Sequence, residues 1–367
     1  MPRANGLYIG AMTGTSVDGL DLALISTAGK LKIERGATTP LPDELRTTLL
    51  SLVTSSRPIG LDFLGHADVA LGRFIGEAVL DFITTSCLQA SNIIAIGSHG
   101  QTIRHRPVGP NAFTMQIGDP HQITELTGIP VVADFRRRDI AAGGQGAPLV
   151  PPFHRAIFAD QKERRIVLNI GGIANITRLA SGELLTGCDT GPGNGLSDIW
   201  TARHLQQSQD HDGAWARSGQ LNELLLKDFL SDAYFAMPAP KSTGREYFNI
   251  DWIEKYVQPI ALPPEDVQAT LIECTACSIA LAINREFAET DRVIVCGGGR
   301  RNLYLMERIG RAMACPVEPS EILGVDGDSL EAAAFAWLAM KAIQNEPANE
   351  PSVTGARSRN VLGVIYR

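Results

Sequence analysis

The sequence is poor in cysteine for its length, with 6 cysteines in 367 residues. So few cysteines cannot form a disulfide-stabilised scaffold, and we expect them to be reduced and mostly buried. The chain also lacks any run of about 18 apolar residues, and it begins Met1-Pro2-Arg3-Ala4-Asn5 rather than with an apolar secretory signal. These absences predict a cytoplasmic protein with no membrane partner.

Positive charge is scarce as well. Lys and Arg total 33 against 40 Asp and Glu, which gives a formal net charge of −7. Proteins that bind nucleic acid through its phosphates need a basic face, so nucleic acid is not an expected partner. Hydrophobic residues make up 44% and charged residues 20%, which is typical of a globular protein and excludes a disordered chain or a coiled coil. A chain of this length predicts two domains.

The two commonest nucleotide-binding motifs are missing. The P-loop pattern G-x-x-x-x-G-K-[ST] does not occur, because Gly29-Lys30 is followed by Leu31. The segment Gly297-Gly298-Gly299-Arg300-Arg301-Asn302 only approaches a dinucleotide fingerprint, since it ends in Asn and lacks the acidic residue expected about 20 positions later. A P-loop or Rossmann enzyme is therefore disfavoured.

Two glycine-rich turns are present instead, each between short apolar runs. Residues 7–9 and 22–25 flank the turn 10–19, and residues 166–170 and 175–179 flank the turn 171–174. Small residues permit a tight bend in which hydroxyls and backbone N–H groups converge on phosphate oxygens. One such turn alone is more often a plain hairpin. The second turn lies about 160 residues after the first, far beyond a solenoid repeat of about 20 to 50 residues, and indicates two half-molecules.

Strand and helix patterns alternate along the rest of the chain, which predicts the α/β fold class. We expect helices at 63–86, 268–287, 303–313 and 330–343, strands at 93–96, 130–134 and 292–296, and an edge strand within the tail 360–366. The polar segment 97–102 follows the strand 93–96, where ligands of open α/β sheets usually bind. A crossover between domains is expected near 135–148.

Several motifs, in order along the chain, resemble those of the anhydro-N-acetylmuramic acid kinase family. They are Met12-Thr13-Gly14-Thr15-Ser16-Val17-Asp18-Gly19-Leu20-Asp21, Gly97-Ser98-His99-Gly100-Gln101-Thr102, Asp134-Phe135-Arg136-Arg137-Arg138-Asp139, Leu168-Asn169-Ile170-Gly171-Gly172-Ile173-Ala174-Asn175, Asp189-Thr190-Gly191-Pro192-Gly193-Asn194, Pro240-Lys241-Ser242-Thr243-Gly244-Arg245-Glu246 and Val295-Cys296-Gly297-Gly298-Gly299. The resemblance therefore covers nearly the whole chain.

The resemblance implies a fold of two duplicated actin/hexokinase-like (ribonuclease H-like) domains with an ATP cleft between them. The expected N-terminal domain is 1–134, with the tail 355–367 packing back onto it, and the expected C-terminal domain is 135–354. The implied activity is an ATP-dependent kinase reaction in which water opens the 1,6-anhydro ring of 1,6-anhydro-N-acetylmuramic acid while O6 takes the γ-phosphoryl group. Its products are N-acetylmuramic acid 6-phosphate and ADP, in peptidoglycan recycling.

The implied cofactors are ATP and Mg²⁺, and the implied partner is a small-molecule sugar. The oligomeric state stays open, with a homodimer as one alternative. The family it resembles belongs to the superfamily of sugar kinases, heat-shock chaperones and actin. Another sugar kinase of this superfamily would have a similar site. A non-catalytic nucleotide-dependent clamp, similar to actin or a chaperone, is the alternative from a different class.

The resemblance assigns ATP binding to three segments: Gly14, Thr15, Ser16, Val17, Asp18, Gly19, Leu20 and Asp21; Asn169, Gly171, Gly172 and Asn175; and Gly297, Gly298 and Gly299. The last three glycines could equally serve helix-to-sheet packing. Superfamily members often carry an acidic residue two positions before the first glycine, where this chain has Met12. Asp18 is the candidate metal ligand, and Asp21 or Asp189 could replace it through water.

Asp189 is the expected catalytic base, because the surrounding glycines place it in a tight backbone and a carboxylate near the anomeric carbon can take a proton from water. An isolated Asp in this pattern would more often form a local Asx-turn. Glu331, at the start of a predicted helix, is the second catalytic candidate. It could bind a sugar hydroxyl or assist the water, or only complement the helix dipole.

Sugar recognition is expected from His99, Gln101, Thr102 and Arg136. His99 could instead be a neutral structural imidazole. Arg136 belongs to a run of three arginines, of which we expect only one to point inward and grip an anion. Cys274 and Cys277 form a C-x-x-C pattern without a second pair, so helix packing is favoured over a metal site.

Overall fold

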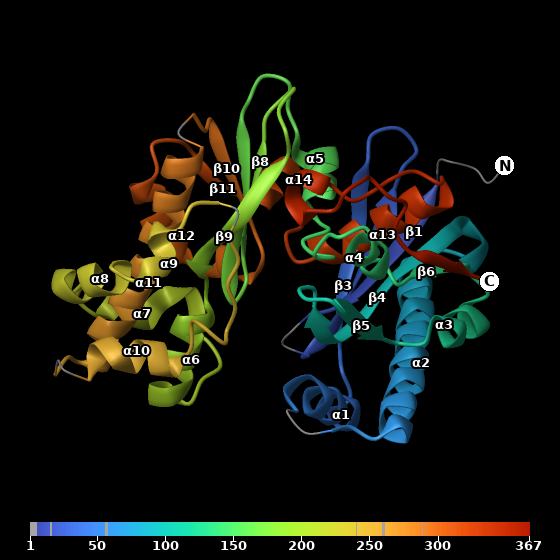
Figure 1. Ribbon diagram of the computed structural model, residues 1–367, viewed down its shortest axis with the longest axis horizontal. Coiled ribbons are helices and arrows are strands. Elements are labelled where there is room, and N and C mark those ends of the chain that lie inside the picture. Colours follow the sequence, from blue (N-terminus) through green and yellow to red (C-terminus); the bar gives the residue numbers. More distant parts are fainter. Residues whose placement is uncertain (1–5, 15–16, 56–57, 240, 259–260, 288) are drawn as a thin grey trace. The chain divides into compact units, whose positions relative to one another are not determined.

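The computed structural model describes residues 6–14, 17–55, 58–239, 241–258, 261–287 and 289–367. They form two compact units (Figure 1). Unit 1 runs to Ile157 and also contains Asp328–Arg367, and unit 2 is Phe158–Gly327.

The sheet of unit 1 begins with an antiparallel meander of β1, β2 and β3, after which β4 and β6 add parallel strands beside β1. The chain's last strand, β12, pairs with β6 at the edge, and β5 pairs with the distal half of β4. The strand order is β12-β6-β4-β1-β2-β3. The bounds are β1 Leu7–Thr13, β2 Gly19–Ser26, β3 Lys32–Pro40, β4 Ile93–Arg106, β5 Phe113–Ile117, β6 Val131–Ala133 and β12 Val364–Tyr366.

The longest helix of unit 1, α2, turns Leu71, Ile75 and Val79 into the core. The bounds are α1 Asp43–Thr54, α2 Leu61–Thr85, η1 Ala90–Asn92, α3 Pro120–Thr127, α4 Arg137–Ala141, α5 Pro151–Phe158, α13 Leu330–Ile343 and α14 Pro351–Thr354.

Helix α13 lies directly on β1 and β4 because two glycines leave room for its backbone. A Cβ on Gly10 would lie 1.7 Å from the carbonyl oxygen of Ala332, and one on Gly97 would lie 2.0 Å from that of Phe335. This contact corrects the expected domain boundary. Residues 135–157 and 328–354 belong to unit 1, whereas the sequence had assigned 135–354 to the second domain.

Unit 2 holds a sheet in the order β11-β10-β7-β8-β9. Its strands are β7 Arg165–Ile170, β8 Ile173–Leu179, β9 Thr186–Pro192, β10 Arg292–Cys296 and β11 Val317–Pro319. Its helices are α6 Gly195–Leu205, η2 His211–Gly213, α7 Ala214–Ser218, α8 Glu223–Leu230, α9 Ala233–Ala236, α10 Ile250–Val257, α11 Pro264–Glu286, η3 Gly298–Arg301, α12 Leu303–Ala312 and η4 Ser320–Leu323.

The two sheets repeat one topology. In each, three antiparallel strands are followed by two parallel strands next to the first, giving β3-β2-β1-β4-β6 in unit 1 and β9-β8-β7-β10-β11 in unit 2. The expected duplicated α/β fold is thereby confirmed.

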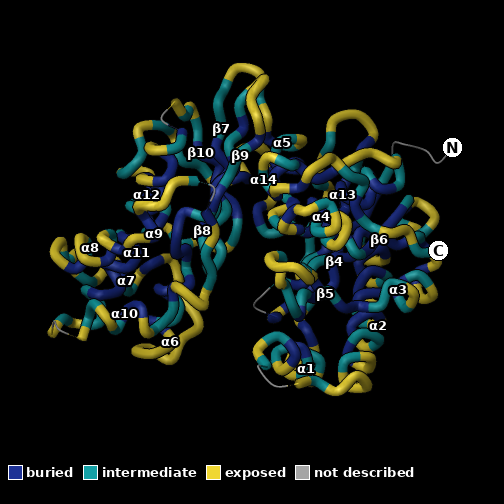
Figure 2. Tube along the Cα trace, viewed as in Figure 1, coloured by how far each residue is buried: buried dark blue, intermediate teal, exposed yellow. Residues whose placement is uncertain are grey.

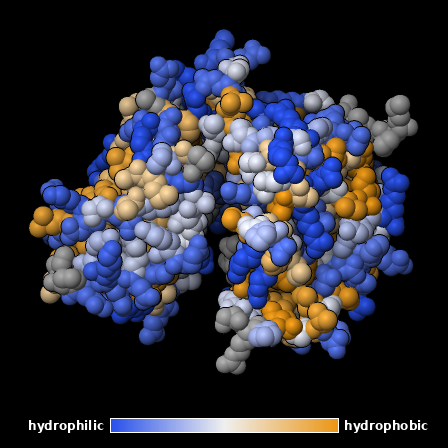
Figure 3. Space-filling model, viewed as in Figure 1, coloured by the Kyte–Doolittle hydropathy of each residue, from blue (hydrophilic) through white to orange (hydrophobic). Residues whose placement is uncertain are grey.

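Helix α11 is the central helix of unit 2. It is long and apolar enough to cross a membrane, but 83% of its apolar window is buried within the protein, as expected for a core helix (Figure 2). Cys274 is buried within it and Cys277 is partly exposed. No cluster of metal-binding side chains occurs among the residues the structure describes. On the surface shown in Figure 3, hydrophobic side chains occur in separate places among hydrophilic ones.

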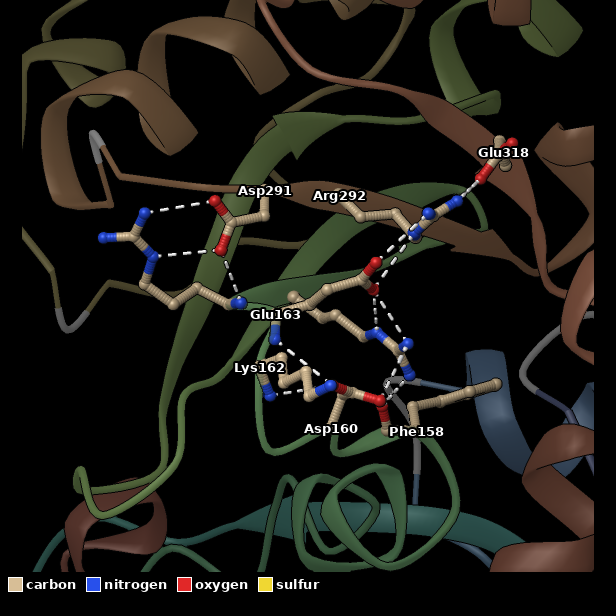
Figure 4. A network of polar contacts seen from close by, with 9 residues as sticks. Phe158, Asp160, Lys162, Glu163, Asp291, Arg292 and Glu318 are labelled. Atoms are coloured by element: carbon tan, nitrogen blue, oxygen red, sulfur yellow. Dashed lines mark hydrogen bonds and ion pairs between the residues drawn. The ribbon is translucent and has the colours of Figure 1, made fainter.

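A charged network joins the amino ends of β7 and β10 (Figure 4). Glu163 pairs with both Arg165 and Arg292, and Arg292 also pairs with Glu318 of β11. Because β7 and β10 run parallel, Asn169 and Cys296 are paired at the opposite, carboxyl ends of the two strands, where the glycine-rich segments begin.

Candidate active site

Asp189 lies in β9 opposite Asn175 of β8, and its backbone and side chain are both held. Its N–H donates to the carbonyl of Lys241 at 3.1 Å, and its carbonyl accepts from the hydroxyl of Tyr234 at 3.0 Å. Its Oδ2 accepts from the N–H of Thr243 at 3.0 Å. The side chain is thus bound by a segment distant in sequence, so the local Asx-turn alternative is wrong.

The electrostatic environment of Asp189 suits a base. Burial raises the pKa of this carboxyl to about 6, while the Thr243 N–H and the charge of Lys241 act in the opposite direction. A group with this pKa is mostly ionised at neutral pH and is more basic than an ordinary aspartate. It can therefore accept a proton from a bound water.

The glycine turn between β7 and β8 is fastened to the start of α6. Gly193 and Gly195 donate their N–H groups to the carbonyl of Gly172, and Asn194 donates to that of Gly171. A Cβ on Gly193 would lie 2.3 Å from the Gly171 oxygen, so glycine is needed for this close approach. The turn is therefore a rigid feature of unit 2.

Arg245 lies against this turn, with its Nε 3.0 Å from the position a Cβ would take on Gly172. Burial raises the pKa of the Asp198 carboxyl, in the first turn of α6, to about 6. The positive charge of Arg245 acts in the opposite direction. A guanidinium beside a glycine turn can grip a phosphate.

The third glycine segment contains both packed and open positions. Gly297 and Gly299 are packed against Asn169 and Ile170, since a Cβ on either would lie within 2.3 Å of those side chains. Gly298 faces open space, with nothing within 4 Å of such a Cβ. Gly297 and Gly299 are thus packed against the end of β7, and Gly298 is open.

The first glycine turn, in unit 1, leads from β1 to β2. Thr15 and Ser16 lie outside the described residues. The Val17 N–H donates to the Gly14 carbonyl at 3.2 Å, and buried Val17 has a φ of 54°, a strained value for a β-branched residue. Strain of this kind concentrates at ligand-binding turns.

The remaining residues of this segment lie on or next to β2. Gly19 and Leu20 are buried in the strand, and Asp18 is exposed just before it. Asp21 accepts a hydrogen bond from the Thr38 hydroxyl at 2.6 Å. Asp18 is thus the more accessible carboxylate.

His99 and Arg136 contact each other in unit 1. Nε of Arg136 donates to Nε2 of His99 at 3.0 Å, and Nδ1 of His99 donates to the Gly100 carbonyl at 2.8 Å. Burial and the charge of Arg136 hold the pKa of His99 well below its usual range, so the ring is neutral. Burial also lowers the pKa of Arg136 to about 10, opposed by the negative charge of Glu331. The structure therefore brings His99, Arg136 and Glu331 together.

Arg136 is the arginine of its run that points inward, since Arg137 and Arg138 are exposed. Its Nη1 also donates to the Gly146 carbonyl at 2.9 Å. The chain turns sharply just before it, because Asp134 has a φ of 59°. The expectation of a single inward arginine is confirmed.

Gln101 and Thr102 differ from each other. Gln101 is buried, and its Oε1 has no hydrogen-bond partner among the described residues. The Thr102 hydroxyl accepts a hydrogen bond from Gln116 of β5 at 3.0 Å. Gln101 therefore has an acceptor that no described residue uses, whereas Thr102 is engaged with β5.

No pattern in the sequence indicates an individual role for Lys241, Thr243, Arg245 or Tyr234. Three of these belong to the motif 240–246, which carried part of the family resemblance, but their contacts with Asp189 and Gly172 join segments far apart in sequence. Spacing along the chain contains no signal for such contacts.

Comparisons with known proteins show the family of the chain. The family model for anhydro-N-acetylmuramic acid kinase matches residues 6–367. The chain belongs to the anhydro-N-acetylmuramic acid kinase family. A relative of that name from Xylella fastidiosa is 46% identical over 370 residues, covering 100% of this chain and 97% of the relative. Another, from Coxiella burnetii, is 47% identical over 370 residues, covering 100% and 98%.

Membership of the anhydro-N-acetylmuramic acid kinase family makes the chain an ATP-dependent sugar kinase and so an enzyme. The alternative of a non-catalytic clamp is thereby set aside. Among solved structures, an activator of 2-hydroxyisocaproyl-CoA dehydratase from Clostridium difficile with bound ADPNP aligns with a TM-score of 0.47 at 14% identity, covering 92% of this chain and 97% of that one.

Proposed function

We propose that this kinase opens 1,6-anhydro-N-acetylmuramic acid with water and phosphorylates the released O6 from ATP, giving N-acetylmuramic acid 6-phosphate and ADP for peptidoglycan recycling. The observation that carries the proposal is the buried carboxylate of Asp189, which has a pKa of about 6 and one oxygen bound by Thr243. Such a carboxylate can take a proton from water in this reaction, as it would from a sugar hydroxyl in an ordinary sugar kinase, so labelled water is needed to separate the two reactions.

In the proposed reaction Asp189 takes a proton from water, and the water oxygen bonds to the anomeric carbon. The bond from that carbon to O6 breaks, O6 bonds to the γ-phosphorus, and ADP leaves. A positioned base contributes about 10²- to 10⁴-fold to such a rate. Glu331 is the proposed second carboxylate, which binds a sugar hydroxyl or assists the water.

Triphosphate binding is proposed for the glycine turns of both units. The turn beginning at Gly14, with Thr15 and Ser16, and the turn at Gly171 and Gly172 supply backbone N–H groups and hydroxyls. Arg245 adds a positive charge beside the second turn. Gly298, which is open, is proposed to allow the nucleoside to approach β10.

Mg²⁺ is the proposed metal, and it would supply charge neutralisation on the transferring phosphoryl group. The chain offers it few ligands, since no cluster of three metal-binding side chains exists among the described residues. This fits Mg²⁺, which usually binds one or two carboxylates together with phosphates and water. Exposed Asp18 is the proposed ligand, with Asp21 nearby in β2.

Sugar binding is proposed for His99, Gln101, Thr102 and Arg136. The guanidinium of Arg136 would hold the lactyl carboxylate, since a fork of N–H donors fits a planar anion. Neutral His99 fixes the arginine, and the Oε1 of Gln101 accepts from a sugar hydroxyl.

We also propose a cytoplasmic location without nucleic-acid or membrane partners, and a homodimer stays a prediction.

The deciding experiment supplies the anhydro sugar, ATP and Mg²⁺ in ¹⁸O-labelled water. We expect one ¹⁸O at the anomeric position of each phosphorylated product, and no ATP turnover with ordinary N-acetylmuramic acid or glucose. Asp189→Asn should lower kcat about 10²- to 10⁴-fold. Full turnover of this variant, or rapid phosphorylation of an ordinary hexose, would contradict the proposal.

A further inference from the structure

Lys241 is a buried lysine that the proposed reaction does not use. The residue is 7% exposed, and lysine is rarely so buried unless it is paired. Its Nζ donates to the carbonyl of Tyr234 at 3.1 Å and lies 4.4 Å from the centre of the Tyr234 ring. Burying an ammonium group is costly, so a counter-charge or a fixed role is expected for it.

Lys241 and Tyr234 form a closed ring of hydrogen bonds with Asp189. The Lys241 ammonium donates to the Tyr234 carbonyl, the Tyr234 hydroxyl donates to the Asp189 carbonyl, and the Asp189 N–H donates to the Lys241 carbonyl. Two residues further on, Thr243 binds Oδ2. Loss of the Lys241 side chain would remove the hydrogen bond to Tyr234, the residue whose hydroxyl holds the backbone of Asp189.

The charges around the pair are few. Burial and the charge of Arg285 lower the pKa of the Lys241 ammonium, whereas Glu286 and Asp189 raise it, and Lys241 in turn acts on Asp189. Cys188 stays a thiol, because burial raises its pKa to about 11, and burial raises the pKa of the Tyr234 hydroxyl above its usual range. Lys241 is therefore the cation that acts on Asp189.

We propose that Lys241 is the positioning residue for Asp189, holding its backbone through Tyr234 and supplying a positive charge near it. The inference rests on the proposed role of Asp189 as the base. Lys241 itself touches neither water nor sugar in this proposal. Its removal should therefore affect turnover more than substrate binding.

The test compares Lys241→Met, Lys241→Gln and Lys241→Arg in the full-length enzyme, with kcat and both KM values measured from pH 5 to pH 9. Lys241→Met should lower kcat at pH 7 about tenfold or more. It should also move the acidic limb of the kcat profile up by about one pH unit, because an opposite charge near Asp189 is lost. Both KM values should stay within about twofold of wild type. Lys241→Arg should restore most of kcat and the original limb.

Lys255→Met is the matched control. Lys255 also lies over a tyrosine ring, 4.7 Å from the centre of Tyr256, but it is exposed on α10. This variant should keep the wild-type profile. If Lys241→Met does not fold, Lys241→Gln keeps a donor for the Tyr234 carbonyl without the charge, and it should show the same displaced limb.

The outcomes separate this inference from the proposed function. Folded Lys241→Met or Lys241→Gln with an unmoved acidic limb and wild-type kcat would overturn the positioning role, even if Asp189→Asn is inactive. An active Asp189→Asn would overturn the proposed function instead. Failure of Lys241→Arg to restore either kcat or the limb would also count against the inference.

Discussion

Arg136 donates from Nε to Nε2 of His99 at 3.0 Å, and this single contact fixes the protonation state of the histidine. Nε2 must accept, so the proton lies on Nδ1, which donates to the Gly100 carbonyl. The ring also packs against Phe335 of α13, with 4.6 Å between ring centres. Neutral His99 therefore acts as a rigid support for the arginine.

Arg136→Lys should impair sugar binding selectively. A lysine keeps the charge but cannot reach both His99 and the Gly146 carbonyl in the same geometry. We expect KM for the anhydro sugar to rise about tenfold while KM for ATP is unchanged. Steady-state kinetics with each substrate varied will measure this, and Arg137→Lys, at the exposed neighbouring position, is the control. Equal effects of the two variants would contradict the assignment.

The buried histidines predict a loss of stability in acid. Burial lowers the pKa of His154 to about 3, below its unfolded value, so the unfolded chain takes up a proton that the folded chain refuses. The stabilisation is complete above about pH 6.5 and is lost as pH falls below it, by about 1.4 kcal/mol per pH unit.

His154→Gln should therefore flatten this dependence. Between pH 7.5 and 5.0, the free energy of unfolding should fall by about 2 kcal/mol less in the variant than in the wild type. Denaturant unfolding at both pH values measures this. His66→Gln, at an exposed position on α2, is the control and should not change the slope. An unchanged slope in His154→Gln would show that this histidine does not contribute.

Much of the fold was predictable from sequence, because its elements have regular patterns. The helices expected at 63–86 and 268–287 are α2 and α11, observed at Leu61–Thr85 and Pro264–Glu286. Strand β3 was not predicted, since its sequence Lys32–Pro40 is largely exposed and carries charged residues without alternation. Edge strands of this kind depend on pairing with a neighbour, which a local pattern does not encode.

The domain assignment of α13 needed information that no local pattern holds. The helix was predicted at 330–343 and lies at Leu330–Ile343, but it was assigned to the second domain. Its place in unit 1 depends on the contacts of its backbone with Gly10 and Gly97. In the same way, Asp189 was predicted from its motif, whereas Lys241 and Thr243, which hold it, were identified only from the fold.

Asp189→Asn should stabilise the protein while it removes activity. The folded pKa of about 6 lies above the unfolded value, so ionisation costs stability that is lost as pH rises from about 4 to 6. At pH 8 the variant should unfold with a free energy about 1–2 kcal/mol higher than wild type, and at pH 4 the two should be similar. Denaturant unfolding at both pH values tests this. A variant that is less stable at pH 8 would contradict the burial of a charged carboxylate.

Arg245→Ala should weaken nucleotide binding. With the guanidinium removed from beside Gly172, we expect KM for ATP to rise about tenfold and KM for the sugar to stay constant. Arg203→Ala, which removes an arginine paired with Glu254 on the same unit, is the control. Calorimetric titration with ADP in the absence of sugar checks the same point. Unchanged nucleotide affinity in Arg245→Ala would remove this residue from the site.

Two glycines in unit 1 should respond to alanine in opposite directions. On Gly97 a Cβ would meet the Phe335 carbonyl at 2.0 Å, so Gly97→Ala must push α13 away from β4 and should cost more than about 2 kcal/mol of stability. Gly65 lies within α2 with nothing within 4 Å of such a Cβ, so Gly65→Ala should stabilise the helix by about 0.5–1 kcal/mol. Thermal unfolding of both variants measures the contrast. Because α13 also carries Glu331, Gly97→Ala should lower kcat as well, and a Gly97→Ala enzyme with wild-type stability would contradict the packing of α13 on the sheet of unit 1.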